Sequence, residues 1–564
     1  MGMLIVSNSL WSRPQLHVHA AVLLVFFAAT AGAATFTVSN NNDSGAGSLR
    51  QAILAVNGQS SGDHVISING GLTIRPTSEL DAVFYLPGRV SIEGNGSTID
   101  GTDIIGEGGG LLLWTSGSVR NLSITNFPLF GLAISAGNCT VTGCRIGTDN
   151  LGTDQSNGSH GIIAQNATNL AIGSTNSGDA NWILHNGDSG IVVANSSGVT
   201  IRGNLIGFNR TGVSIDTLTD CTIGGGGASG RNVIVGNLFN GIRCISVSDC
   251  LIASNFVGLD GDGFTALGNG LHGIYLYMST NNTIGGDSVF LGNVLCDNAG
   301  SALYLEKSDG NHILGNYMGA SPWGKALRAL IIGDLGNAGD GITIADGSTG
   351  NTVGGANPGE PNLITDNEGA GVRLTGASTR LNALYENAIF GNKGGEIVLQ
   401  DGANDGILPP VITGINPVSG TASAAASVEI FAAASEGQRT FVGKTVADGG
   451  GDFTLDVDLT AYGGMNLTAT QTVDGNTSAL SDPYPVPATG EIAAGRASHI
   501  EAPRGRRSES ASHSLMTPGR QTQTARSSVR AGPVGDGSGV RARGVYVLVD
   551  MGESVEERVW FRSR

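Results

Sequence analysis

Proline and charged side chains are scarce in this sequence. Only 16 of the 564 residues are proline, which is too few for a collagen-like chain or a proline-rich linker. Charged residues make up 14% and hydrophobic residues 40%, a balance that argues against a wholly disordered chain. After the N-terminal segment, no apolar run approaches the roughly 18 residues that a membrane-spanning helix needs. We therefore expect no transmembrane anchor in the mature chain.

Glycine is the residue in excess. The chain holds 90 glycines, roughly twice the usual share of about 7%. A glycine-rich, charge-poor chain that still folds must turn often, which indicates many short strands and an all-β fold. The length also exceeds what one ordinary core supports, so we expect two or more structural units.

The net charge is −17 and the pI is about 4.9. Such a surface repels nucleic acid and anionic lipid, so neither is expected as a partner. It suits calcium, or a neutral or cationic glycan, although an acidic surface is most often only a solvated extracellular face. The sequence identifies no cofactor, and calcium is the one candidate ion.

Residues 1–33 have the pattern of a signal peptide. Arg13 supplies a positive flank, residues 20–29 form a short apolar run, and Ala31-Gly32-Ala33 is a small-residue cleavage site. This pattern predicts export and a secreted or cell-surface protein whose mature chain begins at Ala34.

Short phrases recur along residues 64–406. One is a glycine followed by alternating apolar residues, starting at residues 161, 190, 212, 241 and 273, which are 22 to 32 residues apart. Others are Thr-Ile-Gly-Gly and the phrase that contains Asn204, Asn255 and Asn316, with Cys144 at the equivalent place. Apolar residues at i and i+2 indicate strands, and strands this short must stack on neighbours to bury a face. The pattern predicts a parallel β-helix whose three asparagines stack and share amide hydrogen bonds.

Residues 34–63 are expected to cover the first coil with a strand and a helix. Residues 47–57 read as an amphipathic helix, with Ser48 as N-cap and Leu49, Ala52, Ile53 and Val56 on one face.

The run TFTVSNNNDSGAGSLRQAILAVN at residues 35–57 resembles the CSLREA-like start of bacterial secreted right-handed parallel β-helix repeat proteins. The resemblance covers residues 35–406 and implies a solenoid with the pectin lyase fold. It implies no particular function, because polysaccharide lyases, epimerases and adhesins share this architecture.

Two further segments follow the solenoid. Residues 410–487 carry longer alternating strands and predict a small β-sandwich, which resembles a bacterial immunoglobulin-like module. Residues 491–564 are rich in arginine, serine and glycine and predict a disordered tail. The tail is either native sequence or the product of a frame shift in the coding sequence.

Six cysteines lie in the solenoid segment, at positions 139, 144, 221, 244, 250 and 296. Cys139, Cys221 and Cys250 precede the same strand phrase, which favours free thiols stacked in the core. One or more disulfides in an exported protein is the alternative, and no spacing indicates a zinc site.

No catalytic motif is evident, so the candidate binding residues come from loops. They are Asp149 with Asp154, Asp260 with Asp262, and Trp323 with Lys325 in the irregular segment 320–335. Arg202, Arg243 and Arg373 are candidates for contacting a sugar carboxylate, whereas His160, His185 and His272 read as isolated solvent-facing histidines. The regular repeat favours a protein that binds a polysaccharide or a cell-surface partner along its long face, and we expect this protein to be a monomer. A carbohydrate-active lyase or epimerase is the alternative.

Overall fold

The computed structural model describes residues 32–85, 88–288, 290–321, 335–434 and 437–488. These residues belong to one compact unit, Met1–Ala497. Most of the predicted signal peptide and all of the predicted tail lie outside the described residues, as do Trp323 and Lys325.

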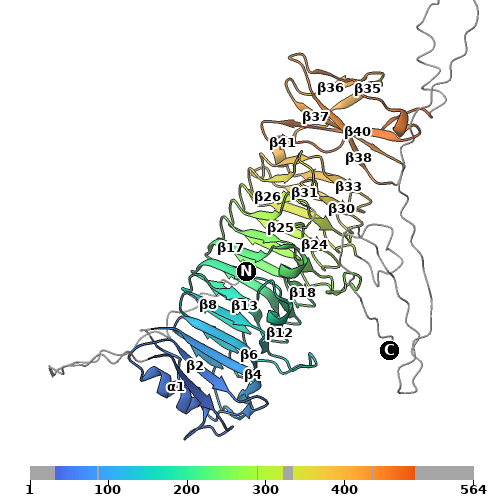
Figure 1. Cartoon of the computed structure of the whole chain (residues 1–564). Helices are drawn as coiled ribbons and strands as arrows, with labels where there is room; N and C mark the ends of the chain where they lie inside the picture. Colours follow the sequence, from blue (N-terminus) through green and yellow to red (C-terminus); the bar gives the residue numbers. More distant parts are fainter. Residues whose placement is uncertain (1–31, 86–87, 289, 322–334, 435–436, 489–564) are drawn as a thin grey trace, which may run out of the picture. The chain divides into compact units, whose positions relative to one another are not determined.

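The chain forms a parallel β-helix in which each regular coil contributes one strand to each of three faces (Figure 1). On the first face lie β1 (Ala34–Val38), β2 (His64–Ile68), β8 (Cys139–Thr142), β11 (Ala171–Ile172), β14 (Ser197–Ile201), β17 (Thr219–Gly224), β20 (Leu251–Ala253), β23 (Thr283–Gly285), β26 (His312–Leu314), β29 (Thr352–Gly354) and β32 (Ala383–Tyr385). Two long strands, β4 (Val90–Asp100) and β6 (Gly117–Thr125), run from the first face into the second.

The second face contains β3 (Thr73–Ile74), β9 (Arg145–Ile146), β12 (Trp182–Leu184), β15 (Leu205–Gly207), β18 (Val233–Val235), β21 (Phe256–Val257), β24 (Val294–Leu295), β27 (Tyr317–Met318), β30 (Leu363–Thr365) and β33 (Ala388–Phe390). The third face contains β5 (Leu111–Leu113), β7 (Leu132–Ile134), β10 (Ile162–Gln165), β13 (Ser189–Ala194), β16 (Thr211–Asp216), β19 (Ile242–Ile245), β22 (Ile274–Tyr277), β25 (Leu303–Glu306), β28 (Ile342–Ala345), β31 (Val372–Thr375) and β34 (Ile397–Gln400). The prediction of a right-handed parallel β-helix is confirmed.

Aliphatic columns fill the interior. On the third face Ile191, Val213, Ile242 and Ile274 lie in register on successive strands, and each is 0% exposed. Burial of each such side chain contributes about 2 kcal/mol, which no single short strand could obtain alone.

Asparagine ladders line the corners between the faces. In each ladder the amide nitrogen of one asparagine donates to the amide oxygen of the next, 2.8–3.2 Å away. The first corner carries Asn181, Asn204, Asn232, Asn255, Asn293, Asn316, Asn362 and Asn387. The second carries Asn157, Asn186, Asn209, Asn237, Asn269, Asn298, Asn337, Asn367 and Asn392. The third carries Asn282, Asn311, Asn351 and Asn382.

The three asparagines expected to stack, Asn204, Asn255 and Asn316, belong to one ladder but do not contact each other. Asn232 and Asn293 lie between them and complete the chain of hydrogen bonds. Cys144 precedes this ladder, and its backbone N–H donates to Asn181. The asparagine column is therefore about twice as dense as the repeated phrase indicates.

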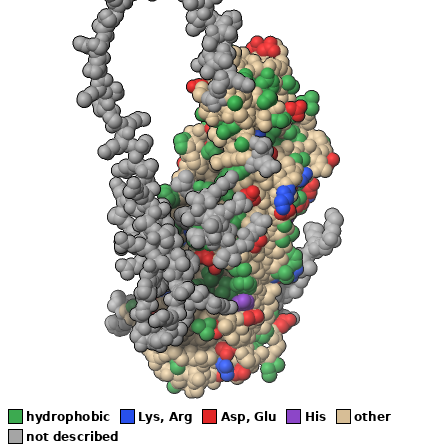
Figure 2. All heavy atoms as spheres, turned by 90° about the vertical axis from the view of Figure 1, so that its right-hand side faces the viewer, with side chains coloured by type: hydrophobic (Ala, Val, Ile, Leu, Met, Phe, Trp, Pro, Cys, Tyr) green, Lys and Arg blue, Asp and Glu red, His purple; other side chains and the backbone are tan. Residues whose placement is uncertain are grey.

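The surface of the solenoid carries few charges. On the side shown in Figure 2, acidic and basic side chains of the described residues are scattered in small groups among uncharged ones. Several large apolar side chains are exposed at loops and corners, including Phe84 (50%) and the adjacent Leu238 (67%) and Phe239 (38%). Scattered apolar residues of this kind are normal on a protein surface.

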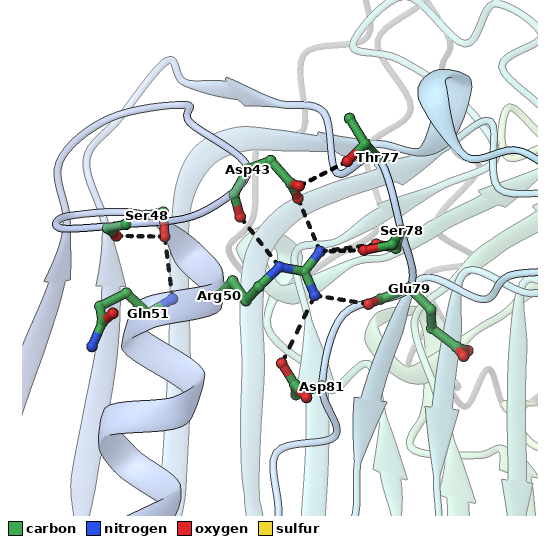
Figure 3. Close-up of polar contacts among 9 residues, drawn as sticks. Asp43, Ser48, Arg50, Gln51, Thr77, Ser78, Glu79 and Asp81 are labelled. Carbon is green, nitrogen blue, oxygen red and sulfur yellow. Dashed lines mark hydrogen bonds and ion pairs between the residues drawn. The ribbon is translucent and has the colours of Figure 1, made fainter.

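A helix covers the first coil, as the sequence predicts. Helix α1 (Leu49–Asn57) buries Leu49, Ala52, Ile53 and Val56, and the Ser48 side chain accepts a hydrogen bond from the Gln51 N–H. Figure 3 shows that Arg50 fastens this helix to the neighbouring loop. Its guanidinium forms an ion pair with Asp43 at 2.9 Å and donates to the carbonyl oxygens of Ser78 and Glu79.

The cysteines divide into one disulfide and four buried thiols. Cys221 and Cys250 lie in register on neighbouring coils and form a disulfide, so the prediction of free thiols is wrong for this pair. Stacked side chains on adjacent strands are near enough to bond, with Cα atoms 4.6 Å apart. Cys139, Cys144, Cys244 and Cys296 are free and buried.

A small β-sandwich follows the last coil. One antiparallel sheet contains β35 (Val411–Ile415), β36 (Val418–Thr421) and β39 (Asp452–Leu455). The other contains β37 (Ser427–Ala433), β38 (Thr440–Val446), β40 (Asn466–Val473), β41 (Asn476–Thr477) and β42 (Tyr484–Pro485). The two sheets share one apolar core that includes Val418, Ile430 and Phe453. The β-sandwich is confirmed, and its likeness to immunoglobulin modules stays a prediction.

Candidate functional site

The predicted aspartate pairs lie in loops between the second and third faces. Asp149 accepts hydrogen bonds from the backbone N–H groups of Leu151 and Thr153, and Asp154 accepts one from Ser156. The Thr153 hydroxyl also donates to Asp149, and these bonds lower the pKa of its carboxyl group. Both carboxylates are therefore engaged by their own loop, as turn-forming aspartates are.

The second pair is arranged in the same way. Asp262 accepts hydrogen bonds from Phe264 and Thr265, and Asp260 accepts one from Gly261. Strands β12, β15 and β18 lie between the coils that carry the two pairs, so the structure does not bring the four carboxylates together.

A cluster of aromatic side chains lies on the outer surface of the third face, on strands β22 and β25 and just before β22. We call it the aromatic face and define it as His272, Tyr275, Tyr277, Tyr304 and the flanking Arg243 and Glu306. Tyr275 is in register with Tyr304 on the next strand and with Arg243 on the preceding one. Along β22 and β25 the aromatic residues alternate with the buried Ile274, Leu276 and Leu305, so the aromatic side chains point outward.

The rings contact one another closely. The centroid of the His272 ring is 4.6 Å from that of Tyr304 and 5.9 Å from that of Tyr275. Tyr275 is 5.8 Å from Tyr304 and 6.4 Å from Tyr277. All four rings are partly exposed, so together they offer a continuous, preformed apolar surface with polar edges.

Hydrogen bonds fix two of these side chains. The Tyr275 hydroxyl donates to the Glu306 carboxylate over 2.7 Å. Burial, and secondly the Glu306 carboxylate, raise the pKa of Tyr275, so the phenol stays protonated. Glu306 is in turn held in place beside the rings as an acceptor.

His272 is held as a neutral ring. Its Nδ1 accepts a hydrogen bond from the Ser301 N–H at 3.0 Å, and burial lowers its pKa to about 4. In this state the proton resides on Nε2, which makes His272 a hydrogen-bond donor and leaves it without a free basic nitrogen. The expectation of an isolated solvent-facing histidine is therefore wrong for His272.

The candidate arginines occupy different places. Arg373 forms a two-point ion pair with Asp340, at 2.9 and 3.0 Å, on the third face. Arg243 lies beside Tyr275 and donates to the Ser214 hydroxyl at 3.2 Å. Arg202 follows β14 of the first face and takes no part in the aromatic face.

The aromatic face was not predicted from the sequence, although a signal for it exists. The runs Gly273–Tyr277 and Ala302–Glu306 alternate buried aliphatic with outward aromatic or charged residues. The first was interpreted only as a strand, and the second was not singled out. Their side chains form one surface because β22 and β25 pair in register, which composition alone does not reveal.

The fold and this surface define a parallel β-helix with a cluster of aromatic side chains on its outer surface. The family model described as "Periplasmic copper-binding protein (NosD)" matches residues 90–319 and 265–396, which together span more than half of the chain. The chain therefore belongs to the NosD family, which that description places in the periplasm. No curated protein matches it.

Three solved structures are similar at low identity. The periplasmic alginate epimerase AlgG is 13% identical, with 60% of this chain and 76% of that chain covered and a TM-score of 0.34. The A-module of the Azotobacter vinelandii mannuronan C-5 epimerase AlgE6 is 14% identical, with 65% and 99% covered and a TM-score of 0.34. Tailspike protein 2 from Escherichia coli O157:H7 bacteriophage CAB120 is 11% identical, with 77% and 60% covered and a TM-score of 0.32.

The described residues do not fit a copper site. Copper prefers imidazole, thiolate and thioether ligands, and no three His, Cys, Asp or Glu side chains come together within the described ranges. Burial raises the pKa of Cys139 to about 11 and those of Cys144 and Cys244 to about 12, which keeps these thiols protonated. The Nδ1 atoms of His160 and His272 already accept backbone hydrogen bonds.

No helix within the described ranges is both long and apolar enough to cross a bilayer.

Proposed function

We propose that this protein is exported and binds a glycan through the aromatic face, without changing it chemically. The observation that carries this proposal is the contact cluster of His272, Tyr275, Tyr277 and Tyr304 on one outer surface. Sugar rings present apolar C–H faces and polar edges, and partly exposed aromatic rings bordered by hydrogen-bonding groups complement both. The Tyr275 ring lies at the centre of the cluster because it contacts the other three, and the Tyr304 ring contacts both Tyr275 and His272.

The test is a glycan-binding measurement on matched variants. After an array screen, isothermal titration with the strongest ligand should show that Tyr304→Ala weakens binding by about 2 kcal/mol, or roughly thirtyfold. Tyr275→Phe keeps the ring and removes only the hydroxyl, so its loss should be smaller. Phe84→Ala removes an exposed ring (50% exposed) outside the aromatic face and should leave affinity unchanged.

Two results would contradict the proposal. One is a protein that binds no glycan on the array, and the other is a bound glycan whose affinity is the same in Tyr304→Ala as in the wild type. Circular dichroism of each variant shows whether the β-helix is intact, so that a loss of affinity is not a loss of folding.

A polysaccharide lyase or epimerase is the second candidate. In its favour, Tyr275, His272 and Arg243 are residue types that transfer protons or bind carboxylates, and they lie on one surface. Against it, Tyr275 holds its proton and His272 has no free basic nitrogen. Incubation with uronate polymers, with and without calcium, tests this candidate. Formation of unsaturated products, followed by their ultraviolet absorbance, would establish a lyase.

A further inference from the structure

We infer that the glycan bound by the aromatic face carries carboxylate groups, as uronate-containing chains do, and that Arg243 binds one of them. The inference rests on the proposed function and adds the class of ligand to it.

Arg373 is the other arginine on the strands of the third face. Asp340 forms hydrogen bonds with both its Nε and its Nη2 atoms and also accepts from the Thr343 hydroxyl and the Ala370 N–H. Asp340 is 8% exposed and the Arg373 side chain is 28% exposed, so this arrangement is a partly buried structural pair. The charge of Arg373 is neutralised within the protein and is not available to a ligand.

Arg243 differs in having no acidic partner. Among the described residues its side chain makes one hydrogen bond, to the neutral Ser214 hydroxyl, and no ion pair. The guanidinium has five N–H donors in a planar fork that matches a carboxylate. It is partly exposed and directly in register with Tyr275, so a sugar over that ring can place a carboxylate beside it.

The second cation of the region lies on the far side of the rings. The Lys307 ammonium is 5.3 Å from the centre of the Tyr277 ring and 4.0 Å from Glu306. Arg243 lies on β19, and Lys307 directly follows β25. These two strands are two strand spacings apart, or roughly 10 Å. The Tyr277 ring therefore lies next to a cation that Glu306 partly compensates, whereas Tyr275 lies next to Arg243, which has no such partner in the described part of the chain.

The positive charge of Arg243 differs in sign from the net charge of the whole chain. A protein of net charge −17 repels polyanions at long range. The Arg243 guanidinium, without an acidic partner within the described ranges, places a local positive charge next to the exposed aromatic rings. It disfavours a cationic glycan and gives no advantage to a neutral one, whereas it matches a uronate.

The experiment compares acidic glycans with their neutral counterparts. Probes are oligomannuronate, oligoguluronate and oligogalacturonate, each beside its carboxyl-reduced form, titrated into the full-length exported protein. At least one acidic probe should bind at least about tenfold more tightly than its reduced form. Arg243→Gln should remove that preference, and added salt should weaken binding of the acidic probe.

Arg380→Gln is the matched control, because it removes the same charge from an exposed position outside the aromatic face. It should retain the preference for acidic probes. Equal binding of acidic and reduced probes, or an acid preference that survives Arg243→Gln, would overturn the inference while leaving glycan binding intact. Binding to none of the probes would overturn the inference too. If the array also yields no ligand, the proposed function fails with it.

Discussion

At the scale of single residues, the asparagine amides carry much of the specificity of the coil. Asn255 is 0% exposed, and its amide nitrogen donates to Asn293 and to the carbonyl oxygens of Ile223 and Ala253, while its amide oxygen accepts from Asn232. Replacing it with alanine leaves several buried groups without partners, at about 1–3 kcal/mol for each such group. We expect Asn255→Ala to lower the urea midpoint strongly, whereas Asn41→Ala, at an exposed position, should not. An unchanged midpoint for Asn255→Ala would show that the ladder contributes little stability.

The buried His272 makes the free energy of unfolding depend on pH. Burial lowers its pKa from the ordinary 6.5 to about 4 in the folded state. Between these values the unfolded chain binds more protons than the folded one, so the stabilisation present above the ordinary pKa is lost as pH falls toward 4.

Urea midpoints measured across that range should therefore decline on acidification, and less steeply in His272→Gln than in the wild type. A variant with the same decline as the wild type would show that His272 is not held neutral.

At the scale of elements, α1 covers the end of the aliphatic column. Ile53 is 0% exposed beneath the helix, and Leu54 on the opposite side is 50% exposed. Ile53→Ala should cost about 3 kcal/mol through lost burial and the cavity left behind, and Leu54→Ala well under 1 kcal/mol. Thermal unfolding compares the two, and equal midpoints would mean that the helix does not seal the first coil.

The six cysteines occupy two chemical states, with four buried free thiols and one disulfide. In the protein purified without reductant, we expect an alkylating reagent to label none of the six under native conditions. After denaturation it should label Cys139, Cys144, Cys244 and Cys296 but neither Cys221 nor Cys250. Mass spectrometry of tryptic peptides reads this pattern directly, and labelling of Cys221 without reduction would contradict the disulfide.

At the scale of the whole molecule, the sequence predicts the features that follow from local patterns. It does not predict the features that depend on the number of residues in each coil. Alternation at residues such as Gly273–Tyr277 predicts strands, and the stacking of strands follows because each is too short to bury a face. The ladder around Asn255 was half missed because its neighbours lie 23 and 38 residues away, so no fixed period finds both. The aromatic face was missed for the same reason, since Tyr275 and Tyr304 become neighbours only through strand register.

The candidate loop aspartates show the opposite limit of sequence analysis, because here the sequence suggested a site where the structure shows ordinary turns. Asp149 and Asp262 were chosen because acidic residues cluster near them, but short-range hydrogen bonds to their own loops account for both. Composition places acidic residues in loops without telling whether the loop itself uses their lone pairs, which depends on the backbone conformation.

The most direct test of the central claim is a crystal structure of the protein with the oligosaccharide that binds most tightly on the array. The account predicts density for a sugar ring against Tyr304 and Tyr275, with a carboxylate beside the Arg243 guanidinium. Sugar bound at the loops of Asp149 or Asp262, with the aromatic face empty, would contradict it.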